Sequence, residues 1–351
     1  MESRWLKSEE GQSLWDEALE RFPEACFSLL YGWRQVYERA FKLKAYYLLA
    51  EDQGQVQGLC PLVFMKSPLI SRGTYLISLP FMTRAGILAA DSAGRDFLLR
   101  QVLEKARELK ADSIELRELD NQGSGETASN QEHVQMILDL PGDWNHFEKQ
   151  VSPRLRQVKK ALNSGLTVKK GRNESLLVDF YEIFSRRMRE LFFPVYPKAF
   201  FKEILLVFKN RVHLVVVYEG EKPLGGMLVF RFRDTISFPY VASLVQHQAL
   251  FPNQLLYHSA IRMAWEEGFK RVDFCRSQVN SGTYSFKTQW KARPQALAYR
   301  YPLYKSGDPL PSIQGARNSW TYRLAERIWP CLPLPVTRWV GGRLIKQLVL
   351  A

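Results

Sequence analysis

The sequence predicts a mixed α/β fold made of two copies of one unit. Two observations indicate this: a strand hairpin that occurs twice, and the same order of strand and helix patterns after each hairpin. The composition agrees, because 351 residues with 46% hydrophobic and 24% charged side chains are typical of a globular chain long enough for two domains.

The repeated hairpin consists of two apolar runs joined by a short polar turn. The runs are 45–50 and 56–65 around the turn 51–54, and 213–218 and 224–232 around the turn 219–222. Aligning Gly58 with Gly226 also aligns the incoming strands at a constant offset. Self-similarity at a fixed spacing indicates a duplicated architecture.

The correspondence continues through three more elements of each copy. A third strand (74–79; 235–241), a helix (94–109; 253–267) and a fourth strand (113–117; 271–276) follow in the same order. Antiparallel strands followed by a helix and a returning strand predict mixed sheets. Each fourth strand carries an acidic residue and then an arginine.

A helical region separates the two copies. Apolar side chains recur at helical spacing on both sides of residue 165, and Pro153 marks a helix start. These are Trp144, Phe147, Val151, Leu155, Phe180, Phe184, Met188 and Leu191. We therefore predict an N-terminal domain over 1–145, a C-terminal domain over 146–310 that includes these helices, and a tail over 311–351. Residues 121–130, rich in Gly, Ser and polar side chains, predict a flexible surface loop.

The charge balance favours an anionic partner. Lys and Arg number 49 against 36 Asp and Glu, a net charge of +13, which suits a phosphate-bearing substrate, an RNA or an acidic membrane face. One run has eight basic residues and no acidic ones: Lys149, Arg154, Arg156, Lys159, Lys160, Lys169, Lys170 and Arg172. On a helix Arg156, Lys159 and Lys160 share one face, which either contacts phosphate or is simply solvated.

Cysteine and histidine usage predicts a reducing compartment and no metal. The four cysteines stand far apart, and the five histidines show no metal-ligand spacing. Neither a signal peptide nor a membrane span is expected from the hydropathy pattern. We therefore expect a cytoplasmic protein, with a possible peripheral location at the inner membrane.

The densest chemical signal lies between residues 272 and 290. The sequence reads VDFCRS at 272–277, SGTY at 281–284 and FKTQW at 286–290, a strand end, a turn and a short amphipathic segment. Polar groups at a strand end are where α/β folds commonly place function. An ordinary strand-turn-helix connection would produce the same periodicity.

These motifs resemble the FemAB family, in particular the branch associated with PEP-CTERM/exosortase and exopolysaccharide systems. Supporting pieces are SLPF at 78–81, ELR at 115–117, the basic run from Arg154, PVY at 194–196 and PN at 252–253, so that the resemblance spans nearly the whole chain. Cys275 and Lys291 stand where the family usually has glycine.

The resemblance implies two tandem GNAT-like (acyl-CoA N-acyltransferase-like) domains and an acyltransferase activity. The substrate would be an amino group of a cell-envelope or exopolysaccharide precursor or peptide. No tightly bound cofactor is implied, and the donor would be an aminoacyl-tRNA or an acyl carrier thioester. A conventional acetyl-CoA enzyme would show a Gln/Arg-x-x-Gly-x-Gly/Ala turn at a helix start. None is found, which weakens acetyl-CoA as the donor.

Lys287 matches the motif lysine that assists catalysis in related enzymes. Amine attack on an ester or thioester builds negative charge on the carbonyl oxygen, which a nearby ammonium stabilises. The alternative is a solvated helix residue. Asp273 is the second catalytic candidate: it could orient the acceptor amine, hold Arg276, or only cap the turn.

The remaining candidates would bind substrate. Arg276 and Arg117 suit anionic groups, although a structural ion pair is as good a reading. Tyr284, Trp290 and Tyr196 could line a pocket or only pack. Further candidates are Ser277, Ser281, Asn253, Arg156 and Lys160.

The tail combines Trp320, Trp329 and Trp339 with six basic residues after position 316. Such a segment can lie at an anionic membrane interface or dock on the protein core. A competing function is a non-catalytic GNAT-fold module that binds an anionic polymer or membrane, and a weaker one is RNA binding without transfer. An enzyme needs an open polar pocket around Lys287, whereas a scaffold could have it filled.

Overall fold

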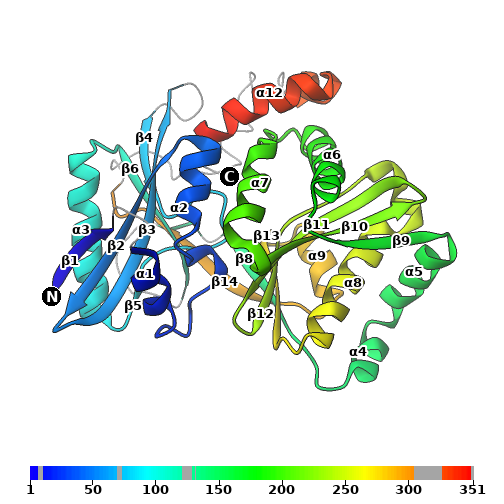
Figure 1. Ribbon diagram of the computed structural model, residues 1–351, viewed down its shortest axis with the longest axis horizontal. Coiled ribbons are helices and arrows are strands. Elements are labelled where there is room, and N and C mark those ends of the chain that lie inside the picture. Colours follow the sequence, from blue (N-terminus) through cyan, green and yellow to red (C-terminus); the bar gives the residue numbers. More distant parts are fainter. Residues whose placement is uncertain (7–10, 69–72, 121–128, 131, 304–325, 349–351) are drawn as a thin grey trace. The chain divides into compact units, whose positions relative to one another are not determined.

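The computed structural model describes residues 1–351 except 7–10, 69–72, 121–128, 131, 304–325 and 349–351 (Figure 1). Most of the predicted loop 121–130 and part of the predicted tail, Trp320 included, lie outside the described residues. Contacts divide the chain into two compact units. Unit 1 comprises Met1–His133, Ala296–Arg323 and Arg343–Ala351, and unit 2 comprises Val134–Gln295 and Leu324–Gly342.

Unit 1 is a mixed sheet with the strand order β1-β2-β3-β4-β6-β14. The strands are β1 (Glu2–Leu6), β2 (Lys44–Asp52), β3 (Gln55–Ser67), β4 (Gly73–Ile77), β6 (Ser113–Leu119) and β14 (Arg293–Arg300), with the short β5 (Leu88–Ala89) beside β3 and β7 (Ser129–Asn130) beside β14. Helix α3 (Ser92–Glu108) begins at Asp91, whose carboxylate accepts a hydrogen bond from Gly94 N. Its residues Leu98, Val102 and Ala106, four apart, are buried in the core of the unit. Helices α1 (Gly11–Leu19) and α2 (Trp33–Val36) lie between β1 and β2 in the chain.

Unit 2 repeats this plan with the order β8-β13-β12-β11-β10-β9. Its strands are β8 (His133–Asp139), β9 (Leu166–Gly171), β10 (Val212–Glu219), β11 (Lys222–Phe232), β12 (Thr235–Ser243) and β13 (Arg271–Gln278). Its helices are α4 (Trp144–Gln150), α5 (Ser152–Asn163), α6 (Glu174–Glu190), α7 (Lys198–Phe208), α8 (Pro252–Glu266) and α9 (Gly282–Thr288). Helix α8 shares a core with Met227 and Val229, whereas Phe180 of α6 lies over Gly226, on the opposite face of β11.

The predicted duplicated α/β fold with mixed sheets is confirmed. Each copy has an antiparallel hairpin, a third strand, a helix, and a fourth strand parallel to the third. Both hairpins shift register at the same place, after Ala50 and after Val217. Gly58 pairs with Ala50 and Gly225 pairs with Val217. Gly225 is therefore the structural counterpart of Gly58, one residue before the Gly226 of the sequence alignment.

Each unit completes its sheet with a strand from the other half of the chain. Unit 1 receives β14 beside β6, with Tyr299 opposite Arg117, and unit 2 contains β8 from Val134 onward. The expected boundary between residues 145 and 146 falls inside α4, within unit 2. The pattern did not predict β8, β9, β14 or α7.

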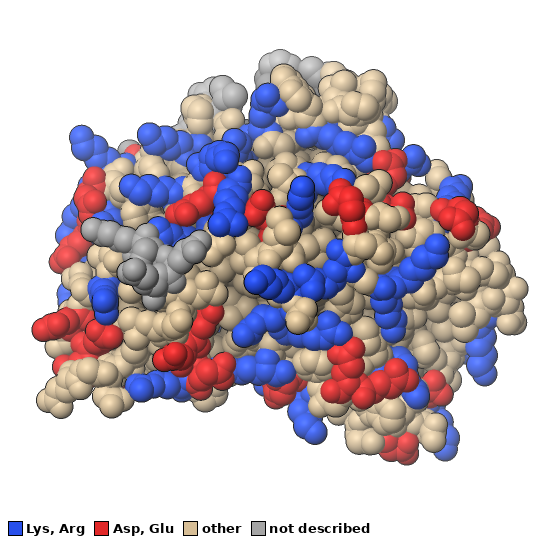
Figure 2. All heavy atoms as spheres, viewed as in Figure 1, with Lys and Arg blue, Asp and Glu red and all other residues tan. Residues whose placement is uncertain are grey.

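Charges of both signs are distributed over the face of the molecule in Figure 2, where Lys and Arg side chains alternate with Asp and Glu. No helix in the described parts of the chain is long and apolar enough to cross a lipid bilayer. Among the same residues, no group of His, Cys, Asp and Glu side chains could hold a metal ion.

Candidate active site in unit 2

The central feature of unit 2 is a fork between two parallel strands. β12 and β13 pair only over Thr235–Ser237 and Arg271–Asp273, although β12 continues to Ser243 and β13 to Gln278. We call the parts of the two strands beyond Ser237 and Asp273 the unit 2 fork. Backbone groups that no longer pair across a fork need other partners, which can be side chains, other backbone groups, water or a ligand.

Asp273 stands where the fork opens and caps the backbone just after it. The side chain is buried, Oδ1 accepts a 2.7 Å hydrogen bond from Cys275 N, and Oδ2 accepts one of 2.7 Å from Gln135 Nε2. Cys275 has φ of 58°, a left-handed conformation that favours glycine. The capping role considered for Asp273 is thus present. Gln135 was missed, although a lone glutamine in the apolar run 134–138 could have signalled a buried polar partner.

Lys287 folds back onto β13 and satisfies the carbonyls there. Ser281 caps α9 by accepting from Tyr284 N at 3.2 Å, and the short helix that follows directs Lys287 toward the strand. Its Nζ donates to Cys275 O at 3.2 Å and to Arg276 O at 2.8 Å. The side chain is 6% exposed, so the alternative of a solvated helix residue is excluded.

Burial sets the protonation of Lys287. Loss of hydration disfavours the ammonium and lowers the pKa of Lys287 to about 8, although Cys275 and Asp273 act in the opposite direction. An ammonium has three N–H donors, and the two carbonyls account for two of them. The third N–H can donate to a bound group.

The other predicted residues of this segment lie in different environments. Ser277 is buried, and its Oγ has no hydrogen-bond partner among the described residues. Arg276 is partly buried, and Tyr284 packs against the hydrophobic core. Trp290 is fully buried in that core, as the packing alternative required.

The predicted binding residues outside the segment are not gathered around Lys287 by any contact in the described structure. Tyr196 is buried in an aromatic cluster of α6 and α7, with Tyr240 of β12 at 5.8 Å between ring centroids. Asn253 is the second residue of α8 and is partly buried. Arg156 and Lys160 are exposed on α5, as expected for either a phosphate contact or a solvated face.

Lys291 also adopts a left-handed conformation, with φ of 67°, and its side chain is exposed. A residue with a Cβ costs about 1 kcal/mol in this conformation, whereas glycine does not. Lys291→Gly is therefore expected to raise the free energy of unfolding by roughly 0.5 kcal/mol, after the greater chain entropy of unfolded glycine is counted. Chemical denaturation measures this, with Lys291→Ala as the control that keeps the Cβ. Equal stability of the two variants would contradict the expectation.

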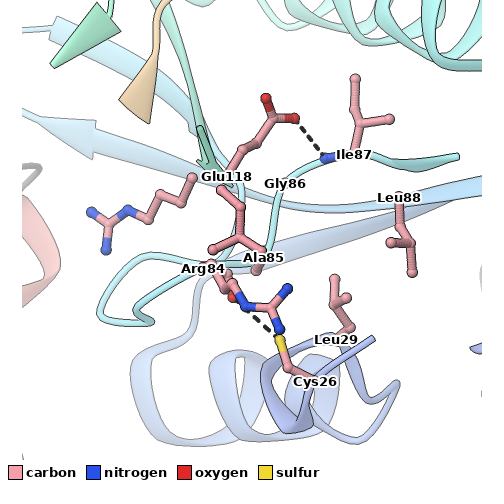
Figure 3. A pocket seen from close by; sticks show the side chains of 10 residues that line it. Cys26, Leu29, Arg84, Ala85, Gly86, Ile87, Leu88 and Glu118 are labelled. Atoms are coloured by element: carbon pink, nitrogen blue, oxygen red, sulfur yellow. Dashed lines mark hydrogen bonds between the residues drawn. The ribbon is translucent and has the colours of Figure 1, made fainter. Parts of the chain in front are cut away.

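The corresponding fork of unit 1 is closed by its own chain. β4 and β6 pair only over Tyr75–Ile77 and Ser113–Glu115, after which Ser78 N donates to Glu115 O, and Ala85 N and Gly86 N donate to Arg117 O. The pocket beside this segment has a volume of about 10 Å³, which is room for one water molecule (Figure 3). An acyl group does not fit there.

Arg117 belongs to the interior of unit 1. It is 1% exposed, donates to Glu115 Oε1 at 2.6 Å and to Met82 O at 3.0 Å, and lies 5.2 Å from the centre of the Tyr299 ring. Arg117 therefore forms a structural ion pair with Glu115, which was the alternative to binding an anionic substrate group. Glu118, one residue later, was missed and is also fully buried.

A second pocket, of about 490 Å³, lies at the edge of unit 2. Lys169, Lys170, Asn173, Asp179 and Tyr218 are among the residues that line it. It combines charges of both signs, and Tyr218 OH donates to Asp179 at 2.6 Å. Neither of the two pockets described here includes Lys287.

The strand order, the parallel fork and the duplicated plan define a tandem GNAT fold. Residues 147–288, which include Asp273 and Lys287, match the family of the acetyltransferase (GNAT) domain. No curated protein matches the sequence.

Three solved structures have the same fold. FemX is 15% identical, with a TM-score of 0.63 over 86% of this chain and 97% of that one. The C-terminal domain of a putative lysylphosphatidylglycerol synthetase from Agrobacterium fabrum is 11% identical, with a TM-score of 0.54 over 81% and 92%. A tandem GNAT protein from the clavulanic acid biosynthesis pathway is 10% identical, with a TM-score of 0.52 over 86% and 98%. At these identities the likeness concerns the fold.

Proposed function

We propose that this chain is an N-acyl or aminoacyl transferase that acts on an amino group of a cell-envelope or exopolysaccharide precursor or peptide. The observation that carries the proposal is Lys287, a buried ammonium at the unit 2 fork inside the segment that matches an acetyltransferase domain. The names of FemX and of the lysylphosphatidylglycerol synthetase support a cell-envelope substrate.

The proposed reaction requires little of the protein beyond positioning and charge. The amine nitrogen attacks the acyl carbonyl carbon, a C–N bond forms, and the C–O or C–S bond to the donor breaks. The carbonyl oxygen becomes an oxyanion on the way, and the amine proton leaves with the donor alcohol or thiol. The third N–H of Lys287 stabilises the oxyanion, and the Ser277 hydroxyl is a second donor on the same strand.

We place the acyl donor in the unit 2 fork rather than in unit 1. The fork of unit 1 is filled by Ala85 and Gly86, whereas the diverging part of β13 is contacted by the side chains of Asp273 and Lys287. An aminoacyl-tRNA or an acyl carrier thioester remains the proposed donor. Mass spectrometry of small molecules and RNA that co-purify with the full chain identifies it, and transfer from that donor to an amine tests the function. Absence of any transfer by the loaded protein would refute it.

The pH dependence of transfer distinguishes two protonation states of Lys287. If the ammonium stabilises the oxyanion, turnover falls as the pH rises through about 8, because the charge is lost. A neutral lysine acting as a base would instead give a rate that rises through the same pH. We expect the fall, measured as single-turnover rates between pH 6.5 and 9.5, a range of about 1.5 units on either side of that pKa.

The same group makes a prediction that needs no substrate. The folded pKa of about 8 lies below the ordinary 10.5, so the unfolded chain binds more protons between these values. Stability therefore rises with pH across this window. We expect the unfolding free energy of the wild type, relative to that of Lys287→Met, to increase as the pH rises above 8. A constant difference would show that Lys287 is not buried in solution.

Burial of Lys287 also supports a second candidate function. Lys287 donates hydrogen bonds to two backbone carbonyls of its own chain. A lysine with this structural role is consistent with a non-catalytic module that binds an anionic polymer elsewhere. In that case Lys287→Met lowers stability and leaves polymer binding intact. Detection of donor-dependent transfer decides between the two candidates.

A further inference from the structure

Helix α12 (Leu334–Leu344) is attached to unit 2 by one of its faces. Gly341 packs so closely that a Cβ there would lie 2.4 Å from Val195 N. Arg338 Nε donates to Ser185 Oγ at 2.9 Å, and its guanidinium lies 5.0 Å from the centre of the Tyr181 ring. The inner face of α12 therefore docks on the protein core, which was one of the two alternatives for the tail.

The opposite face of α12 exposes large apolar side chains. Trp339 is 62% exposed and Val336 is 40% exposed, and their spacing of three places them on one side of the helix. Ile328 and Leu191 are also exposed, at 49% and 52%. Together these four residues form what we call the α12 outer surface.

The end of α6 and the segment before α12 are joined by direct contacts. Arg189 Nη1 donates to Leu332 O at 3.2 Å, and the rings of Phe192 and Trp329 lie 6.3 Å apart. These contacts join the two segments that carry Leu191 and Ile328, each of which is the chain neighbour of one of the two rings. Scattered single apolar residues need no explanation, but a group that includes an exposed indole marks an interaction site.

Basic side chains outnumber acidic ones beside this surface, where the exposed Glu190 next to Leu191 pairs with Arg187. Between residues 326 and 348 the acidic side chains are limited to Glu326, whereas Arg327 and Arg343 are exposed and Lys346 is partly exposed. In Figure 2 tan side chains lie near the upper edge of the view, where Figure 1 places α12, and Lys and Arg side chains below them outnumber Asp and Glu. Apolar side chains with an indole and flanking cations fit an anionic lipid surface, where indoles lie at headgroup depth and cations near lipid phosphates.

We propose that the α12 outer surface docks on an anionic lipid bilayer, with Trp339 inserted among the headgroups. This inference does not depend on the proposed transferase activity, since it concerns binding alone. It would hold the protein at a membrane by a helix that lies on the surface and does not span it. The full chain is expected to sediment with phosphatidylcholine vesicles that contain phosphatidylglycerol, and much less with phosphatidylcholine alone.

Point variants test the surface, because deleting α12 would also remove its contacts with Ser185 and Val195. Trp339→Ser is expected to weaken vesicle binding roughly tenfold, the effect of losing the burial of about half an indole. Arg343→Gln is expected to weaken binding and reduce its salt sensitivity, because charge attraction is screened over about 8 Å at physiological salt. Leu206→Ser is the matched control, since Leu206 of α7 is 54% exposed and lies outside the surface.

Three results would overturn the proposal. The first is failure of the wild type to bind vesicles that contain phosphatidylglycerol. The second is equal binding by Trp339→Ser and Leu206→Ser. The third is concentration-dependent self-association in light scattering that Trp339→Ser abolishes, which would assign the surface to a second copy of the chain. Thermal unfolding of Trp339→Ser is expected to match that of the wild type, because most of the indole is already in water.

Discussion

Replacement of Lys287 by methionine is expected to lower turnover by about a hundredfold or more, while the KM for either substrate changes little. The loss falls on turnover because the ammonium interacts most strongly with the charge that forms in the transition state. Removal of one oxyanion donor typically costs roughly 3 kcal/mol of transition-state stabilisation. Single-turnover transfer from the identified donor measures the effect.

This variant also removes a structural contact, so a control is needed. Without the ammonium, Cys275 O and Arg276 O lose a donor, and we expect the unfolding free energy to change by about 1–2 kcal/mol. Lys270→Met removes an exposed lysine at the start of the same strand and should leave both turnover and stability unchanged. A folded Lys287→Met protein with wild-type turnover would exclude the catalytic role.

Glu118→Gln is expected to lower the free energy of unfolding by about 3 kcal/mol, the largest stability effect that we predict. The Glu118 side chain is fully buried, and its two oxygens accept from Arg95 at 3.1 and 2.7 Å, while Oε1 also accepts from Ile87 N. Glutamine has nearly the same shape, but it removes the charge and presents an amide group to cationic donors. The guanidinium of Arg95 would then lack its counter-charge.

The matched control is Glu108→Gln on α3. Glu108 is 63% exposed and pairs with Lys105, so its loss should cost less than about 1 kcal/mol. Chemical denaturation of both variants at neutral pH provides the comparison. Equal losses of unfolding free energy in the two variants would show that the Arg95–Glu118 pair stabilises the protein no more than an ordinary surface pair.

The duplicated fold could be predicted because strand alternation and turns are local signals. The register was off by one residue at Gly226, since the adjacent glycines Gly225 and Gly226 both offer a match to Gly58 and only the strand pairing selects Gly225. Lys287 could be selected from its motif, but its burial could not, because it depends on how α9 folds back on β13. Glu118 follows a basic residue in a polar stretch that resembles a solvated strand end, and its distant partners Arg95 and Arg300 explain its burial.

The strands β8 and β14 were missed for a related reason. β8 is mostly apolar, whereas β14 begins with an exposed Arg-Pro-Gln segment, and both strands join sheets whose other members lie far away in the chain. Periodicity shows which residues favour a strand, but not which sheet the strand enters. The expected boundary at residue 145 followed from the assumption that each copy is formed by one continuous stretch of the chain.

The exchange of β8 and β14 sets the order in which a growing polypeptide can finish its two halves. Unit 2 has all its strands once residue 278 has left the ribosome, because β8 was synthesised earlier. Unit 1 is synthesised first but keeps an open edge at β6 until β14 arrives. During this interval β6 exposes backbone groups that can pair with any extended segment. The amino-terminal half of this chain therefore remains vulnerable to misassembly until residue 300 has been synthesised.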